Sequence, residues 1–296
     1  MDYFLELLVG GLTRGSIYAL IALGYTMVYG IIELINFAHG EIFMTGAFFT
    51  WWFMSALAIP FPVASLMGIM LATLLGVGIE RVAYRPLRDA PRFAVVISVL
   101  GMSIFLQNMA RIVWGAEFQV FEIDFGIPPV VIGSVIIPFK KIFILVVSLI
   151  LMVALSLFVT KTYLGKAMRA TAADREAAEM MGISSNAVIV LTFVIGSALG
   201  AVAGILYAVN YNSIDPYMGF NAGMKAFAAA VLGGIGNIYG AMLGGLLLGV
   251  FEGAGAAYVS SMYRDAVAFA ILILALIFRP EGLLGEFKSG EKLKAR

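Results

Sequence analysis

Apolar residues along this chain form long runs separated by short polar segments, and each run is close to the length of a membrane-spanning helix. Such a helix needs about 20 mostly apolar residues to cross the hydrocarbon core of a bilayer. The pattern therefore predicts an all-α, polytopic integral membrane protein with about seven to nine transmembrane helices. The predicted helices cover residues 6–32, 41–59, 62–79, 93–114, 142–160, 187–209, 224–236, 239–257 and 265–278.

Glycine interrupts the runs 224–236 and 239–257, which we expect to form broken helices that either cross twice or make a re-entrant hairpin. Composition agrees with a membrane protein, because 62% of the residues are hydrophobic, 12% are charged and 33 are glycine. Membrane helices use glycine to pack closely. We expect residues 1–296 to form a single transmembrane domain.

Lysine and arginine are distributed unevenly, and this predicts the orientation of the chain. Thirteen of the 19 basic residues lie in the segments 81–92, 161–175 and 279–296. Cytoplasmic loops carry an excess of lysine and arginine, so these segments, including the tail 279–296, are expected in the cytoplasm. The acidic or neutral segments 115–138 and 211–222 are expected outside. The N-terminus is then outside and the C-terminus inside, which requires an odd number of crossings and excludes eight.

A short charged stretch, DREAAEMMGISS (Asp174 to Ser185), lies in the predicted cytoplasmic loop 161–185. We expect a helix of about two to three turns here, capped by Thr171 at its start. Asp174 and Glu176 suit the positive N-terminal end of the helix dipole. Gly182 can take the left-handed conformation that ends a helix.

The alanines of this helix leave a smooth face that a protein partner can approach closely, with the flexible side chains of Met180 and Met181 beside it. The alternative is an interfacial helix that rests on lipid headgroups. Because an alanine face buries little area in a bilayer, the pattern favours a protein partner. The alanines are Ala173, Ala177 and Ala178.

This stretch resembles a known motif. Glu176-Ala177-Ala178, followed by three residues and Gly182, is similar to the EAA loop of ATP-binding-cassette (ABC) importer permeases, whose short helix sits in a cleft on the ATP-binding subunit. The preceding run GKAMRATAADREAA resembles the corresponding run in branched-chain amino-acid permeases. The resemblance implies that coupling to the ATP-binding subunit involves Arg169, Asp174, Glu176, Ala177, Ala178 and Gly182.

Two longer stretches, Gly15 to Ala47 and Val231 to Glu252, resemble the N-terminal and C-terminal signatures of LivH-type branched-chain amino-acid permease subunits. The resemblance implies a pore-forming subunit of an ATP-driven importer for branched-chain or related apolar and neutral amino acids. It also implies a bacterial or archaeal plasma membrane as the location. The partners that it implies are a second related permease, two ATP-binding subunits, a periplasmic or extracellular substrate-binding protein and membrane lipid.

Two polar breaks between the apolar runs are candidates for the translocation path. INFAHGE lies in the first half of the chain and GGIGNIYG in the second, and both free backbone groups that lipid cannot satisfy. Paired breaks in two halves of a transporter indicate a path through the protein. The candidate path residues are Asn36, His39, Glu41, Gly234, Gly236 and Asn237.

Structural roles explain the same residues. Asn36 and Asn237 can cap helix ends, and the glycines can let helices pack. His39 is better explained as a hydrogen-bonded structural residue than as a proton carrier, and Glu41 as a favourable charge at a helix N-terminus. The route expected from these residues is weakly polar and has no deep fixed charge, which suits a zwitterion with an apolar side chain.

Other functions are weighed against this one. A secondary transporter couples to ions through buried carboxylates, for which Glu33 and Glu252 are candidates because they lie near or within apolar runs and are expected to make interior polar contacts. Such a transporter has no need of the helix that contains Glu176. An ABC importer permease for urea or short amides is a further alternative.

Several classes of chemistry are excluded by composition. The chain has no cysteine and one histidine, which predicts no metal site, no cofactor and no recognisable catalytic group. It also lacks a G-x-x-x-x-G-K-[ST] phosphate-binding loop, so ATP hydrolysis would belong to a partner subunit. A net charge of +1 gives no indication of nucleic-acid binding.

Overall fold

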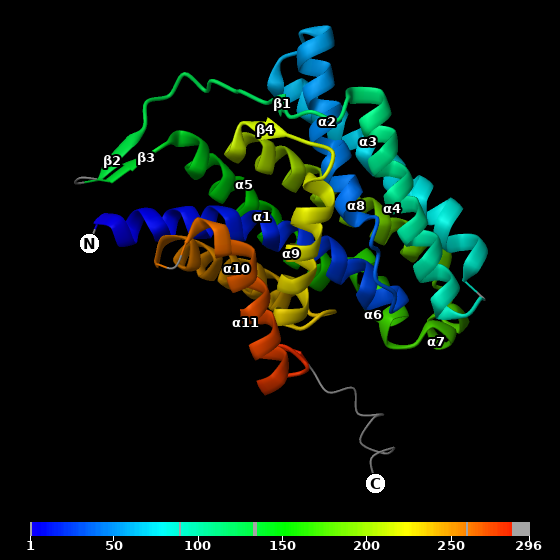
Figure 1. Cartoon of the computed structure of the whole chain (residues 1–296). Coiled ribbons are helices and arrows are strands. Elements are labelled where there is room, and N and C mark those ends of the chain that lie inside the picture. Colours follow the sequence, from blue (N-terminus) through cyan, green and yellow to red (C-terminus); the bar gives the residue numbers. More distant parts are fainter. Residues whose placement is uncertain (1, 89, 133–134, 259, 286–296) are drawn as a thin grey trace.

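The structure, a computed structural model, describes residues 2–88, 90–132, 135–258 and 260–285 and is built almost wholly from helices (Figure 1). The helices are α1 (Asp2–Ile32), α2 (His39–Leu57), α3 (Phe61–Ile79), α4 (Arg92–Trp114), α5 (Phe139–Lys161), α6 (Tyr163–Ala173), α7 (Arg175–Met180), α8 (Ser185–Tyr211), α9 (Met218–Gly233), α10 (Ile238–Tyr258) and α11 (Arg264–Phe278). The short strands are β1 (Gln119–Val120), β2 (Val130–Ile132), β3 (Val135–Ile137) and β4 (Ser213–Ile214). A π-helical turn (Glu80–Tyr84) and a 3-10 turn (Arg85–Leu87) extend α3, and a 3-10 turn (Ser261–Tyr263) precedes α11.

Each of the nine predicted apolar runs is wholly or mostly helical, and the prediction of an all-α polytopic membrane protein is confirmed. Within the described residues, six helices are long and apolar enough to cross a membrane: α1, α3, α4, α5, α8 and α10. The remaining runs form α2, with 19 residues, α9, with 16, and α11, with 15. The number of crossings, seven to nine and odd, therefore stays a prediction.

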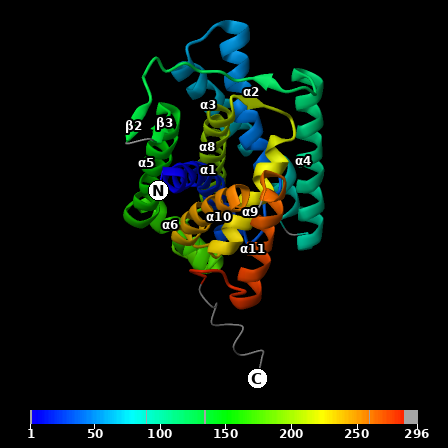
Figure 2. The ribbon, with the colours of Figure 1, turned by 60° about the vertical axis from the view of Figure 1, so that its left-hand side comes forward.

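The helices α1 and α8 form the centre of the molecule. In their most apolar windows 78% and 67% of the residues are buried, against 28% in α3, α4 and α5. The helix α1 packs against α10, α8, α9 and α5, and α8 packs against α2 and α3. Figure 2 shows the surrounding helices from a second side. The outer faces of α3, α4 and α5 are thus available to lipid or to another subunit.

Glycine brings α10 into close contact with α1. A Cβ atom on Gly249 would overlap the backbone of Gly15, and one on Gly245 would overlap the backbone of Ala19. The pairing is antiparallel, since residue numbers fall along α10 as they rise along α1. The predicted break inside run 239–257 is wrong, because α10 is continuous there. Small residues instead let two membrane helices approach each other closely.

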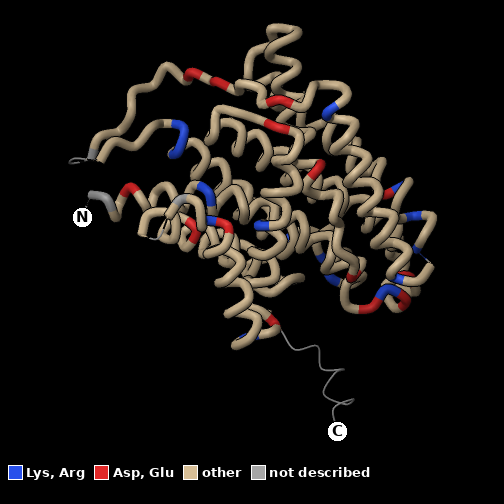
Figure 3. Tube along the Cα trace, viewed as in Figure 1, with Lys and Arg blue, Asp and Glu red and all other residues tan. Residues whose placement is uncertain are grey.

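Two segments that were predicted to lie outside meet at one end of the molecule. β1 pairs antiparallel with β4, with Gln119 opposite Ile214, and β2 pairs with β3 in a hairpin. Figure 1 shows β1 and β4 at the end opposite α6 and α7. Charged residues are sparse along most of the long helices, and one group of them lies around the α6–α7 end (Figure 3).

Candidate functional site

The predicted coupling loop contains two helices, α6 and α7, that meet at Asp174. Asp174 has an extended backbone (φ −157°, ψ 110°), and its side chain accepts a hydrogen bond of 3.0 Å from the Ala177 N–H. The prediction that Thr171 caps this helix is wrong, because the Thr171 hydroxyl donates to the Ala167 carbonyl inside α6 (3.0 Å). Asp174 is the better cap because it lies where the backbone leaves the helix. The helix α7 has six residues and is shorter than expected.

Gly182 ends this loop in the conformation that the sequence predicts. Its φ is +84°, in the left-handed region, and its N–H bonds to the Glu179 carbonyl at 3.0 Å. The Ile183 N–H bonds to the Ala178 carbonyl, also at 3.0 Å. These bonds satisfy the free carbonyl groups at the end of α7 and direct the chain into α8.

The face that α7 leaves exposed differs from the predicted alanine face. Ala178 is 4% exposed and packs within the chain, so the expectation that it faces a partner is wrong. Ala177 and Glu176 are exposed. Met180 and Met181 are 84% and 82% exposed, although methionine is among the more often buried residue types. The accessible apolar surface of α7 therefore consists chiefly of its two methionines.

Arg169 belongs to the support of the loop. Its guanidinium donates to the carbonyl of Val159, near the end of α5. Gly165 also packs against the backbone of Val159. The helix α6 therefore packs against the end of α5, and the Arg169 hydrogen bond stabilises this contact.

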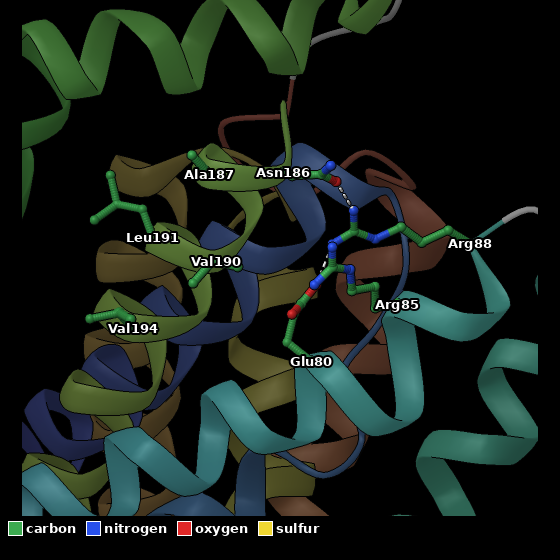
Figure 4. Close-up of a pocket in the computed structure, with 8 residues that line it drawn as sticks. All are labelled: Glu80, Arg85, Arg88, Asn186, Ala187, Val190, Leu191 and Val194. Carbon is green, nitrogen blue, oxygen red and sulfur yellow. Dashed lines mark hydrogen bonds and ion pairs between the residues drawn. The ribbon is translucent and has the colours of Figure 1, made fainter. Parts of the chain in front are cut away.

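Arg88 links the other basic loop to the start of α8 (Figure 4). Its guanidinium donates to Glu80 on one side and to Asn186, in the first turn of α8, on the other. The Glu80 side chain is fully buried and that of Arg88 is 14% exposed. A cavity of about 430 Å³ lies beside these residues, with largely apolar walls. The segment between α3 and α4 is thus joined to the helix that follows the coupling loop.

The first predicted path break, residues 36–41, is buried against α1, α4 and α8. His39 contacts the Tyr25 ring edge-on, with centroids 4.8 Å apart, and its ring fills space left by Gly24 and Gly200. Glu41 lies in the first turn of α2, and its Oε1 accepts a 3.1 Å hydrogen bond from Ser103 of α4. Asn36 is 1% exposed, and neither polar atom of its side chain has a hydrogen-bond partner among the described residues.

The second predicted break, residues 234–237, forms the turn between α9 and α10. Gly234 and Gly236 have positive φ values of 106° and 96°. The Asn237 side chain accepts hydrogen bonds from the N–H groups of Tyr239 (3.0 Å) and Gly240 (3.1 Å), and its amide donates to the Leu284 carbonyl at 2.8 Å. Asn237 thus caps α10 and ties it to the segment after α11. The two breaks lie near the same end of α1, since Gly236 approaches Tyr29 and Gly30.

This geometry sets the expected effect of changing Asn237. Asn237→Leu should lower the free energy of unfolding by about 1–2 kcal/mol, because it removes an N-cap. Asn237→Asp retains the acceptor and should lose less stability. Thermal unfolding of the purified protein measures the difference. If Asn237→Leu left stability unchanged but abolished transport, a role in the path would explain the residue better than the cap does.

Interior charges depart from the sequence expectation. Glu33 is not interior, because its side chain is 41% exposed and pairs with Arg92 at 3.2 Å. Glu252 is fully buried, and Lys225 Nζ lies 3.2 Å from its Oε1. A buried charged pair is therefore present among the described residues, and the expectation that the route itself has no deep fixed charge stays a prediction. Lys225 was not among the predicted interior residues, although a single lysine within an apolar run is itself a signal of an interior polar site.

One family of proteins matches almost the whole chain. The family model described as "Branched-chain amino acid transport system / permease component" matches residues 7–276. The chain belongs to this permease family. The permease is 48% identical over 295 residues to the high-affinity branched-chain amino acid transport system permease protein BraD of Pseudomonas aeruginosa, with 96% of each chain covered.

Two further relatives bear the name LivH. The permease is 46% identical over 301 residues to the high-affinity LivH protein of Escherichia coli, with 96% of each chain covered. It is 26% identical over 297 residues to a probable LivH of Methanocaldococcus jannaschii, with 94% of this chain and 92% of that one covered. The permease is therefore a membrane component of an ABC-type transport system and not an enzyme, and further subunits complete that system.

Proposed function

We propose that this permease imports branched-chain amino acids, as one membrane subunit of an ATP-driven transporter. The full-length similarity to permeases of high-affinity branched-chain amino-acid systems carries the proposal. The short helix α7, with its exposed methionines, supports it, because a secondary transporter has no need of such a helix. The proposed partners are a second related permease, two ATP-binding subunits and a periplasmic or extracellular binding protein.

The proposed coupling runs from α7 into the membrane helices. The docked ATP-binding subunit would bind Met180 and Met181 and move α7. Because only the short segment that contains Gly182 connects α7 to α8, the movement would be transmitted to α8. Arg88 would carry it on to α3, since its guanidinium bonds both Asn186 at the start of α8 and Glu80 at the end of α3.

The proposed path passes the first break. Asn36 has a buried amide with no partner among the described side chains, so it can bond a substrate without breaking an existing hydrogen bond. The side chains of His39 and Glu41 already contact Tyr25 and Ser103 and would shape the path wall. Gly234 and Gly236 would form part of the path wall, in the turn that packs against Tyr29 and Gly30.

The proposed orientation places the α6–α7 end in the cytoplasm and the β1–β4 end outside, with the N-terminus outside and the C-terminus inside. A cysteine at Lys166 should react with a membrane-impermeant maleimide only after the cells are opened. A cysteine at Glu122 should react in intact cells, and both positions are exposed. The native chain has no cysteine, so each variant reports one site. Reaction of the Lys166 variant in intact cells would reverse the orientation.

The proposed substrate can be tested by uptake. Cells that lack their own branched-chain system, but produce this permease and its partner subunits, should accumulate labelled leucine, and unlabelled isoleucine and valine should compete. Urea and acetamide should not compete. Stronger competition by urea or acetamide than by valine would favour the short-amide alternative.

A further inference from the structure

A polar cavity lies near the β4 end of the molecule, where four helices converge. Its volume is about 210 Å³, and polar groups make up most of its wall. Its wall includes three tyrosines and several polar or charged residues, among them Tyr18, Tyr207, Tyr211, Asn221, Lys225 and Asp265. The cavity beside Arg88 differs, because its walls are largely apolar. Tyr211 directly precedes the turn into β4, so the cavity faces the proposed outer side.

Charged groups from four helices, α1, α9, α10 and α11, lie at or beside this cavity. Lys225 Nζ lies 3.2 Å from Glu252 Oε1 and 2.6 Å from Asp265 Oδ1. Arg264 Nε lies 3.8 Å from Glu252 Oε1, too far for a hydrogen bond, and it has no other partner among the described residues. Arg14 packs beside Gly253 and adds a third cation. Three cations thus face two carboxylates.

A cluster that only stabilised helix packing would not need three cations. Pairing Lys225 with Glu252 alone would neutralise the buried carboxylate. The additional Arg264 has a side chain that is 32% exposed and makes no hydrogen bond to Glu252, so its guanidinium is a further cation that a carboxylate ligand can approach. The Asp265 side chain is 65% exposed and can accept a hydrogen bond from an ammonium group. The rings of Tyr207 and Tyr211, tilted by 39° with centroids 4.3 Å apart, are aromatic groups that can bind a cation.

We infer that this cavity binds the zwitterionic head of an amino-acid substrate. The substrate carboxylate bonds Arg264 and Lys225, and the ammonium group lies against Asp265 and the tyrosine rings. This inference rests on the proposed substrate class. It assigns to the permease its own substrate contact near the outer side, separate from the break at residues 36–41. Charged side chains within membrane segments are typically paired or face a polar cavity, and this cluster is paired and borders a cavity.

The experiment measures protection from chemical labelling. The permease, assembled with its partner permease and ATP-binding subunits in lipid nanodiscs but without the binding protein, carries the single substitution Asn221→Cys. Asn221 is exposed and lines the cavity. Millimolar leucine should slow modification by a charged maleimide several-fold. Leucinamide, which lacks the carboxylate, and isocaproate, which lacks the ammonium, should each protect less. Glu122→Cys, which is exposed and is not among the residues that line the cavity, serves as the control and should be unaffected.

Two results would overturn the inference. One is an equal rate of modification with and without leucine at Asn221→Cys and also at Met262→Cys, a second exposed position on the cavity wall. The other is equal protection by isocaproate and leucine, which would mean that only the apolar chain binds. Leucine uptake by the unmodified transporter is measured separately. Uptake without protection removes this inference alone, whereas absence of uptake removes the proposed function.

Discussion

Replacing both Met180 and Met181 with aspartate is expected to abolish transport while the permease still folds and inserts. Both side chains are more than four-fifths exposed, so the substitution disturbs no internal contact. If they fill a cleft on the ATP-binding subunit, two buried charges there should weaken docking by about 3 kcal/mol or more, which is more than a hundredfold in affinity. Retention of the ATP-binding subunit on the purified permease, together with leucine uptake, measures the effect.

Ala177→Ser is the matched control, since Ala177 lies on the same exposed surface and the change is small. Ala178→Trp would be a poor test of docking, because Ala178 is buried and its carbonyl bonds the Ile183 N–H. That variant should damage the loop itself. Normal uptake by the double aspartate variant would show that the methionines do not bind the ATP-binding subunit.

Gly249→Ala is expected to destabilise the permease strongly, and far more than Gly101→Ala. The added Cβ would overlap the Gly15 backbone, and two helix backbones cannot give way as a flexible side chain can. Overpacking typically costs about 1–3 kcal/mol, and we expect the upper end of that range where two backbones must separate. The yield of folded protein and its unfolding temperature in detergent should both fall clearly.

Gly101→Ala provides the comparison, because Gly101 lies on an exposed face of α4 with no atom near the added Cβ. This change should leave stability unchanged or raise it slightly, since alanine favours helix over glycine. Equal stability of the two variants would mean that α1 and α10 are not in the close contact described here.

The helices could be predicted from the sequence because each depends on local composition. Long apolar runs predict where membrane helices lie, and the runs 93–114 and 265–278 agree with α4 and α11 to within a residue at each end. Gly182 could be predicted as the end of α7 because few other residues adopt a positive φ at low cost.

The parts that could not be predicted depend on contacts between distant segments. Nothing local shows that Ala178 turns inward while Ala177 is exposed, since this depends on how α7 packs against α6 and α8. The hydrogen bond from Asn237 to Leu284 spans 47 residues and changes a path candidate into a helix cap. Glu252 could be identified as interior, but its partner Lys225 is 27 residues away on another helix.

ATP-dependent uptake into proteoliposomes tests the central claim most directly. The complete transporter, reconstituted with this permease and supplied with the binding protein and leucine on the outer side, should accumulate leucine only when ATP is present with the ATP-binding subunits. Ionophores that collapse proton and sodium gradients should leave the accumulation unchanged. Accumulation without ATP that an ion gradient drives and an ionophore abolishes would contradict the account and identify a secondary transporter.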